Sequence, residues 1–208
     1  MNYYYFDYSY ILFMLPAFII SIYAQIKVSS AFNKYSKIQN KKGLTGADAA
    51  YKVLASNDVR NVFISHIQGK LSDNFDPRDN TIKLSDSVYD QNSIAAVGVA
   101  AHEAGHAVQF AQNYSFFKLR SALVPVTQFS SMISMPLFFI GLLLPTQYSF
   151  LLNAGIILFS VAVLFQLITL PVEFDASKRA IKALEGQGML EGEELEGAKK
   201  VLKAAALT

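Results

Sequence analysis

The chain has 208 residues, of which 52% are hydrophobic and 16% charged, and its mean hydropathy is +0.29. This composition is more apolar than that of an ordinary soluble domain, and its apolar residues are concentrated in blocks, which indicates a membrane protein. The net charge of +2 requires no nucleic-acid partner, and the absence of cysteine fits a reducing compartment.

Three apolar blocks are long enough to cross a hydrocarbon core of ~30 Å as helices. The first, Tyr10 to Ile26, lacks the basic start and cleavage site of a signal peptide, so we expect a retained N-terminal anchor over residues 1–26. The aromatic residues in and before this block are typical of a membrane interface: Tyr3, Tyr4, Tyr5, Phe6, Tyr8 and Tyr10.

The other two blocks, Ala122 to Leu144 and Tyr148 to Leu170, are separated only by residues 145–147. They predict a transmembrane helical hairpin over residues 122–170, because two long buried helices would be unusual in a soluble chain of this length. Basic residues follow the first block, precede the second and follow the third. The positive-inside rule therefore predicts an external N-terminus, with residues 27–121 and 171–208 on the cytoplasmic side.

The segment after the first block mixes polar and apolar residues. Residues 27–39 continue the helical spacing of the first block, and Thr45 with Asp48 forms a capping box for a short helix. Val59 to Ile67 and Thr81 to Leu84 have the composition of strands, with a turn-rich segment between them. This pair is either an exposed edge to which a peptide can add or an ordinary hairpin, and the sequence does not separate the two.

The stretch from Ala100 to Ala107 contains the pattern H-E-x-x-H in His102, Glu103 and His106. It lies in an apolar run free of proline, with Asn92 or Ser93 available as N-cap, which predicts a helix from about Ser93 to Ala111. Residues four apart share a helix face, so the two imidazoles can bind one ion. Glu103 lies near that ion, where a general base for water should be.

A catalytic zinc site normally has a third protein ligand, which must lie on the same side of the membrane as His102. Two crossings return the chain to that side, and Pro171 is well placed to start a new helix there. Glu173 and Asp175 are the first carboxylates after the third block. Because they are two residues apart they face different ways on a helix, so at most one of them should be the ligand.

The C-terminal part predicts two helices, one ending near residues 185–188 and one from Glu191 to Leu207. The chain stops on an apolar run without a cap. We therefore expect a fourth span to begin near Val201 in a longer coding sequence.

The segment His102 to His106, followed after a hairpin by Glu173-Phe174-Asp175-Ala176-Ser177, resembles the YugP-type membrane-bound zinc metallopeptidases of bacteria. It resembles more distantly the HtpX-like and CAAX-prenyl-protease group, which has an E-F-x-A-D segment. The resemblance covers nearly the whole chain and implies that Glu173 is the third ligand, that the reaction is peptide-bond hydrolysis and that the protein lies in the bacterial cell membrane. The distant group has Asp where this chain has Ser177.

The fold class predicted is a mainly α multi-pass membrane protein with an N-terminal anchor, a small α+β zincin-like cytoplasmic domain, a helical hairpin and C-terminal helices. The predicted function is that of a gluzincin-like zinc metalloendopeptidase acting on a peptide or protein. Zn²⁺ is held by His102, His106 and Glu173, and Glu103 takes a proton from water. Arg179 or His66 is a candidate to stabilise the oxyanion.

Two alternatives remain. A non-catalytic membrane scaffold that keeps zinc for structure would need a fourth protein ligand, with His66 or Asp76 the candidates. A transporter or channel would place ionisable residues inside its spans, yet the second and third blocks carry only neutral polar groups.

Overall fold

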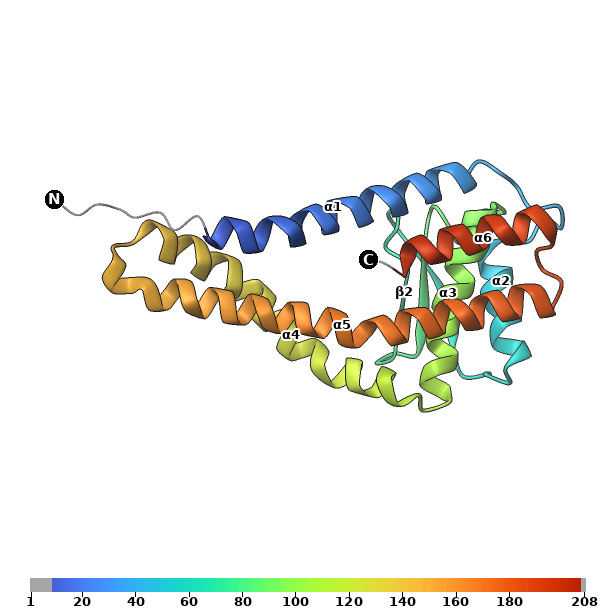
Figure 1. The fold of residues 1–208 in the computed structure, drawn as a ribbon. Helices are drawn as coiled ribbons and strands as arrows, with labels where there is room; N and C mark the ends of the chain where they lie inside the picture. The colour runs from blue at the N-terminus through green and yellow to red at the C-terminus, as the bar shows by residue number, and fades with distance from the viewer. Residues whose placement is uncertain (1–8, 207–208) are drawn as a thin grey trace. The chain divides into compact units, whose positions relative to one another are not determined.

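The computed structural model describes residues 9–206, which are mainly helical with one small sheet (Figure 1). The expected interfacial residues Tyr3, Tyr4, Tyr5, Phe6 and Tyr8 lie outside the described residues. The described chain divides into two compact units. The first combines residues 9–18 with Ser115–Leu170, and the second combines Ile19–Tyr114 with residues 171–206.

The first unit contains the start of helix α1 (Ser9–Tyr35), helix α4 (Ser115–Leu143) and the first part of helix α5 (Ser149–Gly186). A short 3-10 helix, η1 (Thr146–Tyr148), joins α4 to α5, which confirms the helical hairpin. The two helices approach closely at small residues. A Cβ atom added to Gly141 would clash with the backbone N of Leu152, and one added to Gly155 would lie 2.8 Å from the backbone N of Phe138.

By length and composition, α4 and α5 are the two described helices that could cross a membrane. Few of their apolar side chains are buried, and many are exposed, including Phe129, Leu143 and Ile157. Such large apolar surfaces are the part of a helix that lipid would cover. Residues 9–26 of the predicted anchor lie in α1, where Phe18, Ile20 and Ile26 are exposed, but α1 is not among these two helices, so the anchor stays a prediction.

In the second unit, a sheet of three strands has the order β1-β3-β2. β1 (Phe63–Ile67) pairs in parallel with β3 (Thr81–Ser85), while β2 (Asn74–Asp76) pairs antiparallel with β3. The hairpin alternative was therefore wrong: the two strands predicted from sequence run parallel, and a third strand lies in the segment predicted as a turn. β2 went unrecognised because only three residues pair in a stretch dominated by Asp, Asn and Pro.

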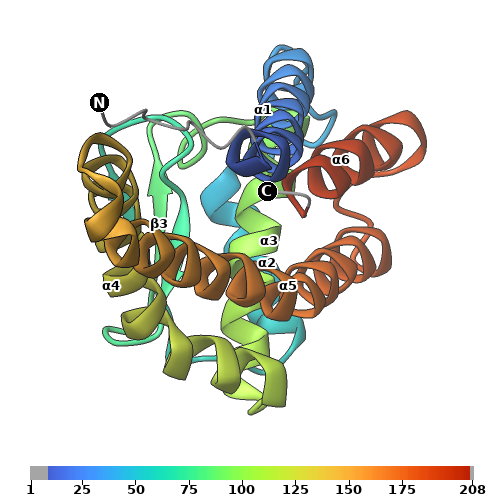
Figure 2. The same cartoon turned by 60° about the vertical axis from the view of Figure 1, so that its left-hand side comes forward.

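Helix α3 (Ile94–Ala111) is the centre of this unit and contacts helices α2 (Gly46–Ser56) and α6 (Gly192–Ala205) as well as β2 and β3 (Figure 2). Its start is as predicted, since the Ser93 hydroxyl accepts a hydrogen bond from the Ala96 N–H. The Thr45–Asp48 capping box of α2 is also confirmed. Val201, where a fourth span was expected to begin, is buried in α6, and the existence of that span stays a prediction.

Helix α5 continues from Ser149 to Gly186 without a break, and Pro171 lies inside it. The expectation that Pro171 starts a new helix was wrong. A proline costs a helix one hydrogen bond, but here the following turns bury a regular stripe made of Val172, Ala176 and Ala180. Packing of this stripe outweighs the local preference of the proline for a helix start.

The stripe packs against α3 through a glycine. A Cβ atom added to Gly105 would lie 2.7 Å from the backbone O of Ala176, closer than real Cβ contacts. Only glycine therefore permits this separation of the two helices. Gly98, two turns earlier on α3, has room for a side chain. A Cβ atom added there would lie 3.7 Å from the Cβ of Ala198, which is an ordinary van der Waals contact.

We expect Gly105→Ala to lower the free energy of unfolding by about 1–3 kcal/mol, because the new methyl group must push apart two backbones. Gly98→Ala adds the same atom to the same helix in ordinary contact, and it should be neutral or slightly stabilising. Thermal unfolding of the detergent-solubilised variants, followed by circular dichroism, makes the comparison. Equal melting temperatures for the two variants would contradict the close approach of α3 and α5 at Gly105.

Candidate metal centre

The two histidines of the H-E-x-x-H pattern point the same way from α3, as the four-residue spacing predicts. Their rings are nearly perpendicular, with centroids 4.6 Å apart, and both residues are buried. Glu173 on α5 meets them: its Oε2 lies 3.1 Å from Nε2 of His102 and 3.4 Å from Nε2 of His106. One carboxylate oxygen thus faces both imidazoles.

These three residues, His102, His106 and Glu173, have donor atoms that all lie within 4.8 Å of one another, and we call them the metal group. Two atoms bound to one tetrahedral zinc at about 2.0–2.1 Å are about 3.3–3.4 Å apart, so the distances of 3.1 and 3.4 Å from Glu173 to the two imidazoles fit a shared ion. Two imidazoles and one carboxylate are also a donor set that zinc accepts. The residues therefore fit a zinc ion with three protein ligands.

The tautomer of His106 is determined by Gln109, which lies three residues later on α3 and is fully buried. The Gln109 amide nitrogen donates to the Val172 carbonyl and to the Asp175 carboxylate, both at 2.8 Å. Since both partners only accept, the other amide atom is the oxygen, and it lies 3.0 Å from Nδ1 of His106. The Nδ1 atom must therefore carry the proton, which leaves Nε2 with the lone pair that a metal needs.

His102 has a different partner. Its Nδ1 lies 3.2 Å from the hydroxyl oxygen of Ser177, which is one turn after Glu173 on the same face of α5. The group beside this imidazole is therefore a hydroxyl and not a carboxylate. It can accept a hydrogen bond from the Nδ1–H group without adding a negative charge beside the two histidines and Glu173.

Asp175 is not part of the group formed by the two histidines and Glu173. It binds Gln109 and Arg179, and Arg179 also donates to the Gln112 side chain. Arg179 is therefore engaged in joining α5 to the end of α3, which does not support it as the oxyanion-stabilising residue.

The other candidate residues are also engaged elsewhere. His66 lies 2.7 Å from Asp86, so the structure does not support it near the reaction either. Asp76 binds Arg78 and Lys83. Neither belongs to the group formed by the two histidines and Glu173.

Glu103 is not one of the three residues of the metal group, and its side chain points toward the sheet. Its Oε2 accepts a hydrogen bond of 3.0 Å from the backbone N–H of Phe75 in β2. Burial raises the pKa of the Glu103 carboxyl to about 7, against the opposing charge of His102. A carboxyl with such a pKa exchanges protons readily at neutral pH.

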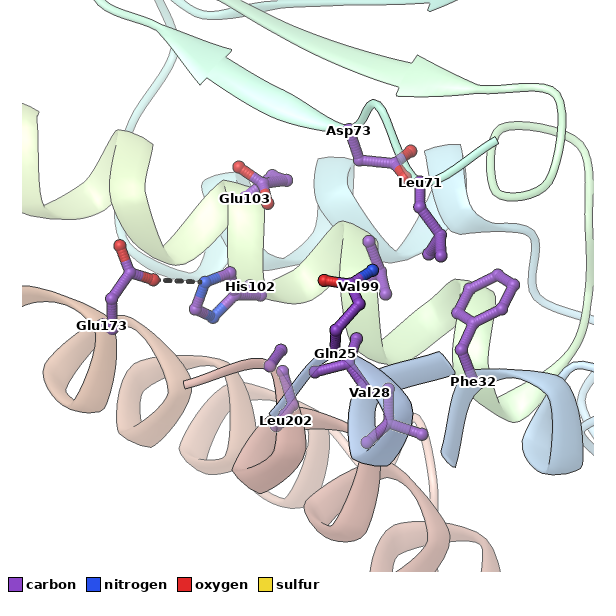
Figure 3. Close-up of a pocket in the computed structure, with 12 residues that line it drawn as sticks. Gln25, Val28, Phe32, Leu71, Asp73, Val99, His102, Glu103, Glu173 and Leu202 are labelled. Carbon is purple, nitrogen blue, oxygen red and sulfur yellow. Dashed lines mark hydrogen bonds and ion pairs between the residues drawn. The ribbon is translucent and has the colours of Figure 1, made fainter. Parts of the chain in front are cut away.

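A cavity of about 290 Å³ opens beside this group (Figure 3). Glu103, His102 and Glu173 line one end of it. Most of the other lining residues are apolar and come from α1, α3, α6 and the segment before β2. The metal group is therefore accessible from a pocket that the protein itself forms.

Sequence reasoning missed Gln109, Phe75 and the role of β2. The position of Gln109 carried a signal, because a residue seven after His102 and three after His106 shares their helix face. A glutamine on an apolar face needs partners, and the histidine beside it is one. The contact of Phe75 with Glu103 depends on strand pairing distant in sequence and carried no such signal.

Comparison with known proteins agrees with this geometry. The sequence model of a family described as "Putative neutral zinc metallopeptidase" matches residues 10–208. The chain is 44% identical over 199 residues, 96% of its length and 88% of the relative, to the "Putative membrane protease YugP" of Bacillus subtilis (strain 168). No solved structure matches. The chain belongs to this family of neutral zinc metallopeptidases.

Proposed function

We propose that this protein is a membrane-bound zinc endopeptidase whose metal ligands are His102, His106 and Glu173. The observation that carries the proposal is the convergence of both Nε2 atoms on one Glu173 oxygen, with Glu103 adjacent but outside the group. Zinc, when bound, supplies a Lewis acid that acidifies water and polarises a peptide carbonyl. The residues of the chain hold this ion and leave a position for water and substrate.

Glu103 is the general base of the proposed reaction. Its carboxylate takes the proton from the attacking water and then gives it to the leaving amine of the cleaved peptide bond. The Phe75 N–H keeps the carboxylate oriented toward the sheet side of the site. Burial of Glu103 favours the neutral form that must exist between these two transfers.

The polypeptide substrate is proposed to enter the cavity that His102, Glu103 and Glu173 line at one end. A peptide carbonyl bound there would lie within reach of both the metal and Glu103. The Phe75 N–H of β2 already donates to Glu103, so this strand positions the base and is not the strand with which the peptide pairs.

The topology follows from the basic residues. With the N-terminus outside, residues 27–121 and 171–208 are cytoplasmic and carry every basic cluster: Lys27, Lys34, Lys37, Lys41 and Lys42, then Lys118 and Arg120, then Lys178, Arg179 and Lys182. The metal centre is then on the cytoplasmic side of a bacterial cell membrane. A structural zinc site in a scaffold would need a fourth ligand, and both candidates, His66 and Asp76, are held by other partners.

We expect one zinc per chain in the purified, detergent-solubilised protein and much less in Glu173→Ala, because two imidazoles alone hold zinc weakly. Elemental analysis gives the metal content, and circular dichroism shows whether the variant is folded. An unchanged zinc content in a folded variant would remove Glu173 from the site. An unfolded variant would instead favour a structural role for zinc.

Glu103→Gln keeps the size of the side chain but cannot accept a proton. It should retain one zinc and lose at least about a hundredfold in kcat on a cleaved peptide. Elemental analysis and a fluorogenic peptide assay test the two statements separately. Retained activity in the zinc-loaded variant would require another base.

Gln109→Leu removes the acceptor for the His106 Nδ1 proton, and we expect zinc affinity to fall about 10- to 100-fold. Gln112→Leu is the matched control, because Gln112 lies at the same helix end but contacts Arg179 and no ligand. Competition with a fluorescent chelator measures both affinities. Equal losses in the two variants would show that disturbing the end of α3 is sufficient and that the hydrogen bond to His106 is not needed.

A further inference from the structure

Strand β2 ends in a buried carboxylate to which the proposed reaction gives no role. Asp76 is the last residue of β2, and only 8% of its side chain is exposed. Burying an ionised group removes its hydration, which is unfavourable unless other groups replace the lost water. A hydrophobic residue often stabilises a buried position equally well. The charge at this position therefore indicates a purpose other than stability.

The Asp76 carboxylate is bound by two cationic side chains. Arg78 donates to it from Nε at 3.0 Å, from a terminal guanidinium nitrogen at 2.8 Å and from its backbone N–H at 3.0 Å. Lys83 in β3 donates to it from Nζ at 2.9 Å. These hydrogen bonds hold the pKa of the Asp76 carboxyl well below its usual value, so it is ionised at neutral pH. We call Asp76, Arg78 and Lys83 the charge cluster.

The charge cluster joins β2 to β3 in one register. Lys83 lies opposite Asn74, and Thr81 lies opposite Asp76, so the contact between Lys83 and Asp76 runs diagonally across the two strands. This diagonal pair belongs to one alignment of the strands, because a slip by one residue turns every side chain to the opposite face. The restraint matters for β2, which has only three residues with which to pair.

The same strand carries the group that orients the proposed base. Phe75, next to Asp76, donates its backbone N–H to Oε2 of Glu103 at 3.0 Å. Its ring also contacts the ring of Phe110, two turns after Glu103 on α3, with centroids 5.8 Å apart. Contact between apolar rings is non-directional, whereas a hydrogen bond weakens steeply when its angle changes. The orientation of Glu103 therefore depends on the register of β2.

We propose that Asp76, held by Arg78 and Lys83, is a positioning residue for the reaction: it fixes β2 so that the Phe75 N–H orients the Glu103 carboxylate toward the attacking water. This inference rests on the proposed peptidase function. Asp76 is not one of the metal group, and it acts through Phe75 and Glu103. Its loss should therefore lower kcat and leave zinc content and KM nearly unchanged.

Asp76→Asn keeps the size of the side chain and removes its charge. The probe is an internally quenched peptide selected from a mixed library by wild-type cleavage. We expect kcat of the zinc-loaded, full-length variant to fall about 10- to 100-fold and KM to change less than about threefold.

Asp79→Asn is the matched control. Asp79 also pairs with Lys83, at 2.9 Å, but it is exposed and lies outside β2. Its loss should change kcat less than about twofold, because an exposed ion pair contributes little. An equal loss of kcat in Asp76→Asn and Asp79→Asn would overturn the assignment. A loss in Asp76→Asn that appears only in KM or only in zinc content would also overturn it.

A double variant distinguishes positioning of the base from general weakening of the fold. Adding Asp76→Asn to Glu103→Gln should lower kcat less than about twofold further, because the base that Asp76 orients is already absent. A repeat of the full loss in the Glu103→Gln background would show a purely structural role and refute the proposal.

Arg78 provides a second route if Asp76→Asn does not fold. Its side chain is 88% exposed, and Arg78→Gln leaves Lys83 bound to Asp76. We expect kcat to fall about three- to tenfold in Arg78→Gln and to be partly restored in Arg78→Lys, which keeps the charge without the two-pronged contact. An unchanged kcat in Arg78→Gln would count against the charge cluster.

Hydrogen–deuterium exchange separates this inference from the proposed function. NMR of the zinc-loaded protein in detergent follows the Phe75 amide, which exchanges slowly while it is bonded to Glu103. We expect exchange about tenfold or more faster in Asp76→Asn and little changed in Asp79→Asn. This result supports the link from Asp76 to Glu103 even if wild type cuts no peptide, which would count against the peptidase function. Equal exchange in wild type and Asp76→Asn would refute the link.

Discussion

The close contact between α3 and α5 is the constraint on which the site depends. Gly105 lies between the two histidines. Because it has no side chain, its backbone can approach the backbone of Ala176 closely. This separation lets one oxygen of Glu173 reach both Nε2 atoms, and it also allows the Gln109 amide to reach the Val172 carbonyl. A methyl group at Gly105 would act on all of these contacts at once, because protein interiors are packed too densely to absorb it locally.

Polar groups buried at this contact are satisfied by one another. Gln109 forms hydrogen bonds with the His106 ring and with the backbone of α5. Ser177 forms one with the His102 ring, and Arg179 donates one to Asp175. Because an unpaired buried group costs about 1–3 kcal/mol, each member of this network fixes the next. The imidazoles are thus oriented by the apoprotein itself. Little rearrangement is then needed when a metal binds, and this favours affinity.

Features set by short-range patterns could be predicted from the sequence. The H-E-x-x-H helix with its Ser93 cap, the Thr45 capping box and the helical hairpin depend on residues within a few turns. Features that depend on packing between segments distant in sequence were harder to predict. Residue spacing left Glu173 and Asp175 as equal candidates, and only the resemblance to a family separated them. Pro171 favoured a new helix locally, but tertiary contacts keep α5 continuous, and β2 exists only because β3 pairs with it.

The metal group constrains how the chain between His102 and Glu173 can cross a membrane. His102 and Glu173 are 71 residues apart, and the hairpin of α4 and α5 lies between them in sequence. A chain that crossed a membrane an odd number of times in this interval would place the two residues on opposite sides. A two-helix hairpin is the shortest helical insertion that enters the membrane, crosses it and returns. The metal group therefore requires an even number of crossings, independently of the basic residues from which the orientation was predicted.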